Sequence, residues 1–441
     1  MKNWKKEWLE IRRALRLEGS FVQNSAWMFT SSGLSILIQF LFFPILSRIY
    51  SPEAYGLFGV FNFYTITLGN AMTFGYNQAF VLPDSRREFT LLLHLSFRIS
   101  AAIALLVALT VAIAGHSILD FVDQDNLGWW IHLIAPVSLL MAWDRIASDW
   151  AIRNREFKRQ TAVSTSVTLL SKAFNVGYGL MVSASAAGLI WTTALQHALR
   201  AWSYLQWVIA DTRDRLREKV SWRELRCVAK KYKEFPLFIY WGNVLNIFSG
   251  ALPAALLPLL GFGLESVGFF SYSVIILDLP MRMLGSGIAS VFQQKSAELH
   301  RERPDELRRH TLRLFRGLVL GSLMFALFMW FTGEHLYAFC FGEVWREAGV
   351  AAEWLVIAYF FRMITSPLTV LYTTLRKEKE FFLFQVLLTA VRAASLLIGA
   401  LYADSFIEMM IIFSVANAAA YAWLTIRMLG MINQYRSLKS A

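Results

Sequence analysis

Long apolar runs recur along the whole chain, and they constrain its fold more than any other feature of the sequence. Each run is close to the 20 or so apolar residues that cross a bilayer as a helix, and short polar segments separate the runs. Of the 441 residues, 56% are hydrophobic and only 17% are charged. A soluble chain of this length buries its cores without runs of this kind from end to end. The sequence therefore predicts an all-α integral membrane protein.

The apolar runs predict about twelve transmembrane helices. The fifth and sixth spans are the least certain division, because only a short turn separates them. The predicted spans lie near 24–46, 57–81, 89–114, 128–149, 161–182, 186–209, 236–260, 264–290, 317–341, 350–374, 381–401 and 405–429.

The basic residues of the connecting loops predict the orientation. Alternate loops hold nearly all of the Lys and Arg, and cytoplasmic loops are the ones that carry such an excess. Both termini are therefore predicted to lie in the cytoplasm. The formal net charge of +12 does not predict nucleic-acid binding, because the cations are spread over short loops and not over one soluble face. The basic loops lie near 86–87, 153–159, 213–233, 295–316 and 376–379.

The organisation predicted from these runs has five parts. Residues 1–20 place apolar and basic side chains on opposite helical faces, which is typical of an amphipathic helix on the membrane surface. An N-terminal six-helix lobe is predicted over 21–210 and a basic cytoplasmic linker over 211–235. A C-terminal six-helix lobe follows over 236–430, with a cytoplasmic tail over 431–441.

Short matches indicate that the two sets of six spans are copies of each other. Residues 44–46 and 53–56 read PIL and EAYG, whereas 258–260 and 265–268 read PLL and ESVG. Six is an even number, so both copies enter the membrane from the same side and form parallel repeats. A substrate path is expected where two such lobes meet. The fold class predicted is two parallel six-helix lobes around a central cationic cavity.

Ionisable side chains inside the spans are the candidate site. Each costs about 2.5–3.5 kcal/mol on insertion scales, so such residues usually face a cavity or a partner. The embedded cations outnumber the embedded acids, which predicts an anionic guest or a wet cavity. Arginine suits phosphate because its planar guanidinium makes bidentate hydrogen bonds. The candidate binding residues are Arg98, Lys172, Arg282, Arg362, Arg392, Asp278 and Arg48.

Alternative interpretations apply to several embedded groups. Asp278 and Arg282 are four residues apart and can pair on one helix face, whereas Asp144 and Arg145 are adjacent and should have different partners. Arg145 and Arg200 are near enough to span ends to reach the headgroups instead. His197 is interpreted as a structural imidazole and not as a proton carrier.

Nucleotide and metal chemistry are not expected. The chain has no G-x-x-x-x-G-K-[ST] segment for ATP and no H-E-x-x-H or C-x-x-C motif. No cofactor and no metal site are predicted, and the aspartates at 120–125 are interpreted as a solvated loop. Uphill transport would then use an ion gradient, the membrane potential or consumption of the product. H⁺ and Na⁺ both remain open as coupling ions.

Three segments near the N-terminus resemble a known family. Residues 44–56 (PILSRIYSPEAYG), 74–76 (FGY) and 79–83 (AFVLP) resemble the first spans of polysaccharide transporters. These are the O-antigen-type (Wzx) flippases of the multidrug/oligosaccharidyl-lipid/polysaccharide exporter superfamily. Within the first segment, Pro52 and Gly56 suit a turn between spans.

The resemblance implies a function. It implies alternating access and, as cargo, an undecaprenyl-diphosphate-linked oligosaccharide, such as an O-antigen, capsule or exopolysaccharide unit. The cargo would move from the cytoplasmic to the periplasmic leaflet of a bacterial inner membrane. Membrane lipids are the expected surroundings, and a polymerase and other glycan-assembly membrane proteins are expected partners.

Two other functions are weighed against this one. A drug or cation antiporter of the same superfamily predicts embedded carboxylates for a cationic guest, which is the reverse of the balance in this sequence. A membrane glycan polymerase or ligase would be an enzyme with sizeable periplasmic loops, and the loops predicted here are too short to hold such sites.

Overall fold

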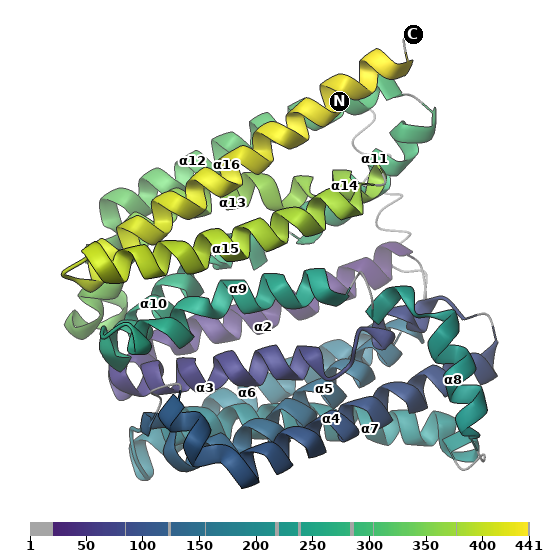
Figure 1. The fold of residues 1–441 in the computed structure, drawn as a ribbon, viewed down its shortest axis with the longest axis horizontal. Helices are drawn as coiled ribbons and strands as arrows, with labels where there is room; N and C mark the ends of the chain where they lie inside the picture. The colour runs from purple at the N-terminus through teal and green to yellow at the C-terminus, as the bar shows by residue number, and fades with distance from the viewer. Residues whose placement is uncertain are drawn as a thin grey trace. The chain divides into compact units, whose positions relative to one another are not determined.

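Helices make up nearly all of the structure (Figure 1). The computed structural model describes residues 21–83, 85–121, 125–154, 156–216, 220–236, 240–282, 286–302, 304–375 and 377–439. No strand occurs in these ranges, as expected for a helical membrane protein. The amphipathic helix predicted over 1–20 lies outside the described residues.

The chain forms two compact units. Unit 1 comprises Met1–Ile49 and Tyr64–Val244, and unit 2 comprises Tyr50–Phe63 and Leu245–Ala441. One division follows Ile49, just before α3 (Pro52–Ala71), and the other two fall inside α3 and inside α9 (Tyr240–Leu259). The first part of α3 therefore belongs to unit 2, although it precedes most of unit 1 in the sequence.

Each unit is a bundle of packed helices. In unit 1, α2 packs against α6, α5 packs against α4 and α7, and the second part of α3 is followed by the short helix η1 (Tyr76–Val81). The other helices of unit 1 are α2 (Phe21–Ile49), α4 (Arg86–Phe121), α5 (Ile131–Arg153), α6 (Phe157–Met181), α7 (Ala186–Leu216) and α8 (Trp222–Lys231).

In unit 2, α13 packs between α12 and α16, and α15 packs on α16 (Figure 1). The helices of unit 2 after α9 are α10 (Gly263–Leu277), α11 (Ser286–Glu302), α12 (Pro304–Phe341), α13 (Arg346–Leu368), α14 (Val370–Thr374), α15 (Glu378–Tyr402) and α16 (Phe406–Lys439).

The twelve predicted spans each overlap a helix. Within the described residues, seven helices are long and apolar enough to cross a membrane, and Gly33–Ile49 and Gly263–Leu277 are shorter apolar helices. The chain is thus a multi-pass membrane protein, and the count of twelve crossings stays a prediction.

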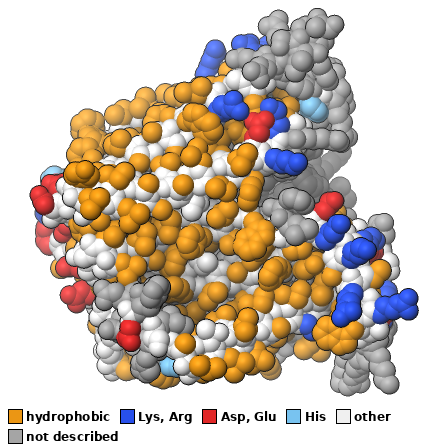
Figure 2. Space-filling model, in the orientation of Figure 1, with side chains coloured by type: hydrophobic (Ala, Val, Ile, Leu, Met, Phe, Trp, Pro, Cys, Tyr) orange, Lys and Arg blue, Asp and Glu red, His pale blue; other side chains and the backbone are white. Residues whose placement is uncertain are grey.

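The outer helices expose apolar side chains as a lipid-facing surface does. On α4, Leu105 and Ile113 are exposed, and on α12, Met324 and Phe331 are exposed. Figure 2 shows hydrophobic side chains along the helices of each unit, with Lys and Arg gathered at one end of the helices and Asp and Glu at the other. A soluble protein seldom exposes so much apolar surface, whereas a bilayer solvates it.

The second predicted span, 57–81, is wrong in its last third. The helix α3 ends at Ala71, and the chain then turns through Phe74 and Gly75, which both have positive φ angles of 48° and 72°. Tyr240 closes this turn, because its hydroxyl donates to the Ala71 carbonyl at 2.7 Å and its ring stacks on Phe74. The apolar residues continue through this turn, and hydropathy carries no information on backbone angles. The sequence pattern therefore does not reveal the break.

The eighth span is also interrupted. The helix α10 ends at Leu277, Asp278 forms a turn, a short helical segment that contains Pro280 follows over 279–282, and α11 begins at Ser286. Proline removes a backbone donor and disturbs the preceding turn. Spans two and eight are counterparts in the predicted repeat. Interruptions at corresponding positions of two repeats are a pointer to the binding segments of a transporter.

Gly56 and Gly268, which correspond in the predicted repeat, make a reciprocal helix contact. A Cβ on Gly56 would lie 1.7 Å from the Leu264 carbonyl oxygen, and a Cβ on Gly268 would lie 2.0 Å from the Pro52 carbonyl oxygen. Small residues allow such close packing of membrane helices. Pro52 is the first residue of α3, where proline is favoured. The interpretation of Gly56 as a turn residue is wrong, because it lies inside α3 at this contact.

The linker predicted over 211–235 contains a helix. The helix α8 begins with a capping box, in which the Ser221 side chain accepts from the backbone and Glu224 accepts from the Ser221 N–H. Arg87 of α4 pairs with Glu224 at 3.0 Å. The Ser221 N–H, and next Arg87, lower the pKa of the Glu224 carboxyl below its usual value. Leu225 and Val228 are buried, so α8 is an amphipathic helix that packs against α4 within unit 1.

Candidate functional site

A single carboxylate of unit 2 lies between two arginines. Asp278, at the break after α10, accepts from Arg362 of α13 at 3.0 Å and lies 3.7 Å from Arg282. The predicted pairing of Asp278 with Arg282 therefore exists, but the contact with Arg362 is closer. The Arg362 guanidinium also lies 5.0 Å from the centre of the Tyr359 ring. Arg282 remains 57% exposed, so its donors are accessible.

Arg392 is the most deeply buried of the candidate cations, at 5% exposure. Its guanidinium donates to Asn417 Oδ1 at 2.8 Å, Ser249 Oγ at 2.6 Å and Tyr421 OH at 3.0 Å. All three acceptors are neutral, so hydrogen bonds hold the side chain without cancelling its charge. Arg392 and Arg362 are close enough to repel each other electrostatically.

The unit 2 cluster therefore carries an excess of positive charge. We call Asp278, Arg282, Arg362 and Arg392 the arginine cluster. Among its described residues, Arg282 and Arg362 share the carboxylate of Asp278, and the third guanidinium, that of Arg392, has only neutral acceptors. Burying an uncompensated charge is costly, and an anion that binds there would lower this cost.

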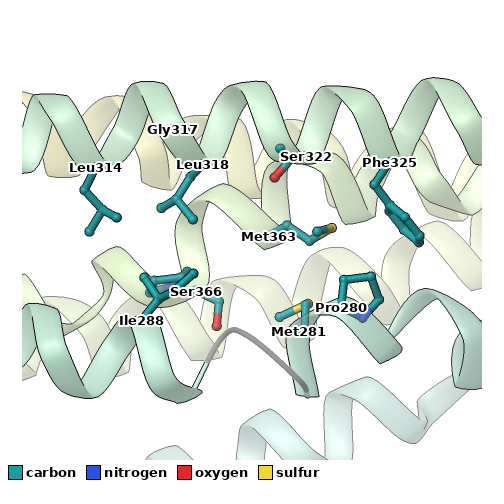
Figure 3. Close-up of a pocket in the computed structure, with 12 residues that line it drawn as sticks. Pro280, Met281, Ile288, Leu314, Gly317, Leu318, Ser322, Phe325, Met363 and Ser366 are labelled. Carbon is teal, nitrogen blue, oxygen red and sulfur yellow. The ribbon is translucent and has the colours of Figure 1, made fainter. Parts of the chain in front are cut away.

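An apolar cavity of about 390 Å³ lies in the same unit (Figure 3). Pro280 and Met281 line it from the break after α10, Met363 from α13, and Gly317 and Gly321 from α12. The lining is almost entirely apolar, so this cavity does not serve the polar part of a ligand.

Unit 1 holds a polar cavity of about 360 Å³. Two carboxylates line it, and each has its own partner. Asp144 Oδ2 lies 3.0 Å from His197 Nδ1, and Asp149 Oδ2 accepts from Asn77 at 2.5 Å. We call this set, with Arg145 and Arg200, the polar cavity.

The two arginines of the polar cavity have neutral partners. Arg145 donates to Asn70 at 3.0 Å, and Arg200 donates to Thr168 at 2.9 Å. The prediction that Asp144 and Arg145 have different partners is confirmed. Two carboxylates and two guanidinium groups balance in this cavity, and the His197 imidazole contacts one of the carboxylates.

Three candidate residues lie in neither cluster. Arg98 is exposed on α4, with its guanidinium 5.6 Å from the Trp222 ring of α8. Lys172 Nζ lies 5.8 Å from the centre of the Phe43 ring, and Arg48 is exposed near the end of α2. The structure thus brings together Asp278, Arg282 and Arg362, with Arg392 nearby. Arg98, Lys172 and Arg48 lie outside this cluster.

Sequence reasoning missed Asp149 and the neutral groups around Arg392. Asp149 stands at the predicted end of the fourth span, but it follows Arg145 by four residues on α5, and this spacing places both side chains on one helix face. Asn417 and Tyr421 are likewise four residues apart on α16. Neutral side chains of this kind are common in membrane helices, so no sequence signal distinguishes them.

A family model described as "Polysaccharide biosynthesis protein" matches residues 45–350. The chain belongs to this family. It is also similar to the succinoglycan biosynthesis transport protein ExoT of Rhizobium meliloti (strain 1021), with 21% identity over 413 residues, covering 92% of this chain and 80% of that protein. The predicted family resemblance is confirmed.

Solved structures of two transporters share the fold. An inward-facing multidrug resistance MATE family transporter of the MOP superfamily matches with a TM-score of 0.71 and 13% identity, covering 93% of this chain and 96% of that one. The lipid II flippase MurJ, in an inward closed conformation, matches with a TM-score of 0.65 and 12% identity, covering 93% and 90%. The predicted all-α membrane fold is confirmed. This member of the polysaccharide biosynthesis protein family therefore shares its fold with transporters of known structure.

Proposed function

We propose that the protein translocates an undecaprenyl-diphosphate-linked oligosaccharide from the cytoplasmic to the periplasmic leaflet of a bacterial inner membrane. The cargo would be an O-antigen, capsule or exopolysaccharide unit, and both termini would face the cytoplasm. The observation that carries this proposal is the arginine cluster, in which Arg282 and Arg362 share the carboxylate of Asp278 and the buried Arg392 has only neutral acceptors.

The diphosphate of the cargo complements this cluster. Guanidinium groups form bidentate, charge-assisted hydrogen bonds with phosphate oxygens. Arg282 has an exposed side chain and only a 3.7 Å contact with Asp278, so an incoming diphosphate can replace the carboxylate as its partner. Arg392 keeps its charge because its acceptors are neutral, and it raises the positive potential at the cluster.

The names of similar proteins support the cargo class. The succinoglycan transport protein is named for polysaccharide transport, and MurJ is named as a flippase of lipid II. The drug or cation antiporter stays the weaker alternative for the cargo, because the arginine cluster repels a cation. The carboxylates that such an antiporter would need lie in unit 1, in the polar cavity.

We further propose that H⁺ is the coupling ion and that it binds at the Asp144–His197 pair. An anion that leaves the negative interior gains about 2.3 kcal/mol per charge per 100 mV, and a proton that enters by the same alternating cycle adds to this driving force. The observation that supports this site is the direct 3.0 Å contact between Asp144 Oδ2 and His197 Nδ1, and the proposal replaces the interpretation of His197 from the sequence as a purely structural imidazole. The predicted contacts with a polymerase and other glycan-assembly proteins remain part of the proposal.

Replacement of Arg362 tests the flippase proposal. In a strain that lacks the wild-type gene, the lipid-linked oligosaccharide should accumulate on the cytoplasmic leaflet, and Arg362→Ala should fail to relieve this accumulation. The matched control is Arg427→Ala, because Arg427 also pairs with a carboxylate, Glu380 at 3.5 Å, and lies 6.0 Å from an aromatic ring, that of Trp423. Equal export by both variants, at equal abundance in the membrane, would overturn the proposal.

A further inference from the structure

The apolar cavity of unit 2 forms where two helices diverge. Near one end of the pair α12 and α13, the helices touch closely, because a Cβ on Gly349 would lie 2.6 Å from the Gly333 carbonyl oxygen. Further along α12, a Cβ on Gly317 or Gly321 would meet no atom within 4 Å. Gly317 and Gly321 therefore border open space and not a packed helix interface.

Two prolines shape the other walls of the cavity. Pro280 lies in the break between α10 and α11, and Pro367 lies at the end of α13, just before the chain changes to α14. Both residues line the cavity. Both prolines lie in helical backbone, where proline removes a hydrogen-bond donor and kinks the helix. Figure 3 shows Pro280, Met281 and Met363 on one side of the space and the α12 side chains on the other.

The cavity and the arginine cluster are built on the same two segments. Met281 lines the cavity and directly precedes Arg282, and Met363 lines it and directly follows Arg362. The volume of about 390 Å³ lies within the range of pockets that bind small ligands. A ligand that occupies both the apolar cavity and the arginine cluster needs an anionic group close to an apolar chain.

We propose that this cavity receives the isoprenoid segment next to the diphosphate of the cargo, an inference that rests on the proposed flippase function. An isoprenoid chain is joined directly to its phosphate, which suits an apolar cavity whose lining residues Met281 and Met363 are sequence neighbours of Arg282 and Arg362. In a phospholipid, by contrast, a glycerol group separates the phosphate from two acyl chains. Burial of the chain adds apolar binding free energy, and the cavity holds the chain while the arginines hold the diphosphate.

The experiment fills the cavity from α12. The full-length protein in nanodiscs is tested for equilibrium binding of undecaprenyl diphosphate, inorganic diphosphate and dioleoyl phosphatidic acid. Gly321→Leu should weaken the binding of undecaprenyl diphosphate about tenfold or more (about 1.4 kcal/mol) and leave the binding of inorganic diphosphate unchanged. The matched control is Gly430→Leu, because Gly430 of α16 also has no atom within 4 Å of its Cβ position and does not line the cavity.

The outcomes separate the two proposals. Unchanged binding of undecaprenyl diphosphate by Gly321→Leu overturns the chain site. Equal weakening for phosphatidic acid overturns the isoprenoid assignment, because the cavity then holds an ordinary acyl chain. If Arg282→Ala leaves the binding of inorganic diphosphate unchanged, the arginine cluster does not bind the diphosphate. That result overturns the proposed function and does not bear on the cavity. Gly317→Leu, one turn earlier on α12, repeats the test if Gly321→Leu does not reach the membrane.

Discussion

The two units hold ionisable groups in contrasting ways. In unit 1, two carboxylates, two arginines and a histidine line one polar cavity, and the acid and base charges balance. In unit 2, two arginines share one carboxylate, a third has only neutral acceptors, and the cavity described in this unit is apolar. Two units of one membrane protein thus present different chemistry. The polar cavity suits a small cation such as H⁺, and the arginine cluster suits an anion.

The difference follows from how each charge is compensated. Asp144 and Asp149 each have a close polar partner, and two arginines in the same cavity balance their charges. Arg392 has only neutral acceptors, so its charge persists. Membrane depth makes an uncompensated charge costly. We infer that a charge is retained there because the transported anion uses it.

The largest expected effect is that of Arg392→Ala. Loss of the guanidinium removes the persistent charge of unit 2, and hydrogen bonds to charged groups contribute about 1.5–3 kcal/mol each. Export should fall roughly 100-fold or more. Arg392→Lys keeps the charge but loses the planar fork, so it should restore part of the activity. Export is measured by glycan at the cell surface, with membrane abundance as the reference. Wild-type export by Arg392→Ala would contradict the proposal that the uncompensated charge of unit 2 serves the transported anion.

The second effect concerns unit 1. Asp144→Asn removes the carboxylate that contacts His197, so transport should fall about tenfold, the range expected for one charged hydrogen bond. Its rate should also lose its dependence on an imposed pH gradient. Transport is followed in proteoliposomes at several external pH values. Asp404→Asn, an exposed residue outside the polar cavity, is the control. Retention of the full pH response by Asp144→Asn would exclude this pair as the proton site.

Asp278→Asn is expected to have a smaller effect, which is a gain in anion binding and not a loss of transport. Asp278 competes with an anion for Arg282 and Arg362. Removal of one partly exposed charge should strengthen the binding of inorganic diphosphate about fivefold, because such a pair contributes up to about 1 kcal/mol. Binding is measured on the purified protein. Weaker binding would show that Asp278 orients the arginines and does not compete for them.

The smallest effect is expected for Arg98→Ala. Arg98 is exposed and contacts the ring of Trp222, and a cation–π contact at an exposed site contributes about 0.5–1 kcal/mol. Export should fall less than about fivefold, which corresponds to this energy. A loss as large as that of Arg392→Ala would place Arg98 on the cargo path and would extend the cationic site into unit 1.

Hydrophobic periodicity by itself determines most of the helices. Each predicted span overlaps a helix, because a bilayer requires about 20 apolar residues whatever the packing. The membrane class, the family and the pairing of Asp278 with Arg282 also follow from residue types and spacing. The break after Ala71 does not, because a positive φ at Phe74 depends on the contact with Tyr240.

Tertiary structure alone decides which embedded charges meet. Arg98, Lys172 and Arg392 look alike in the sequence, since each is one cation within an apolar run. In the structure, Arg98 lies against Trp222 and Lys172 against Phe43, whereas only Arg392 is enclosed by neutral acceptors. The apolar cavity depends on the divergence of α12 and α13, which are distant from the α10 break in sequence. Partners that lie on different helices leave no local pattern, so the balance of charge at a site is a property of the folded protein.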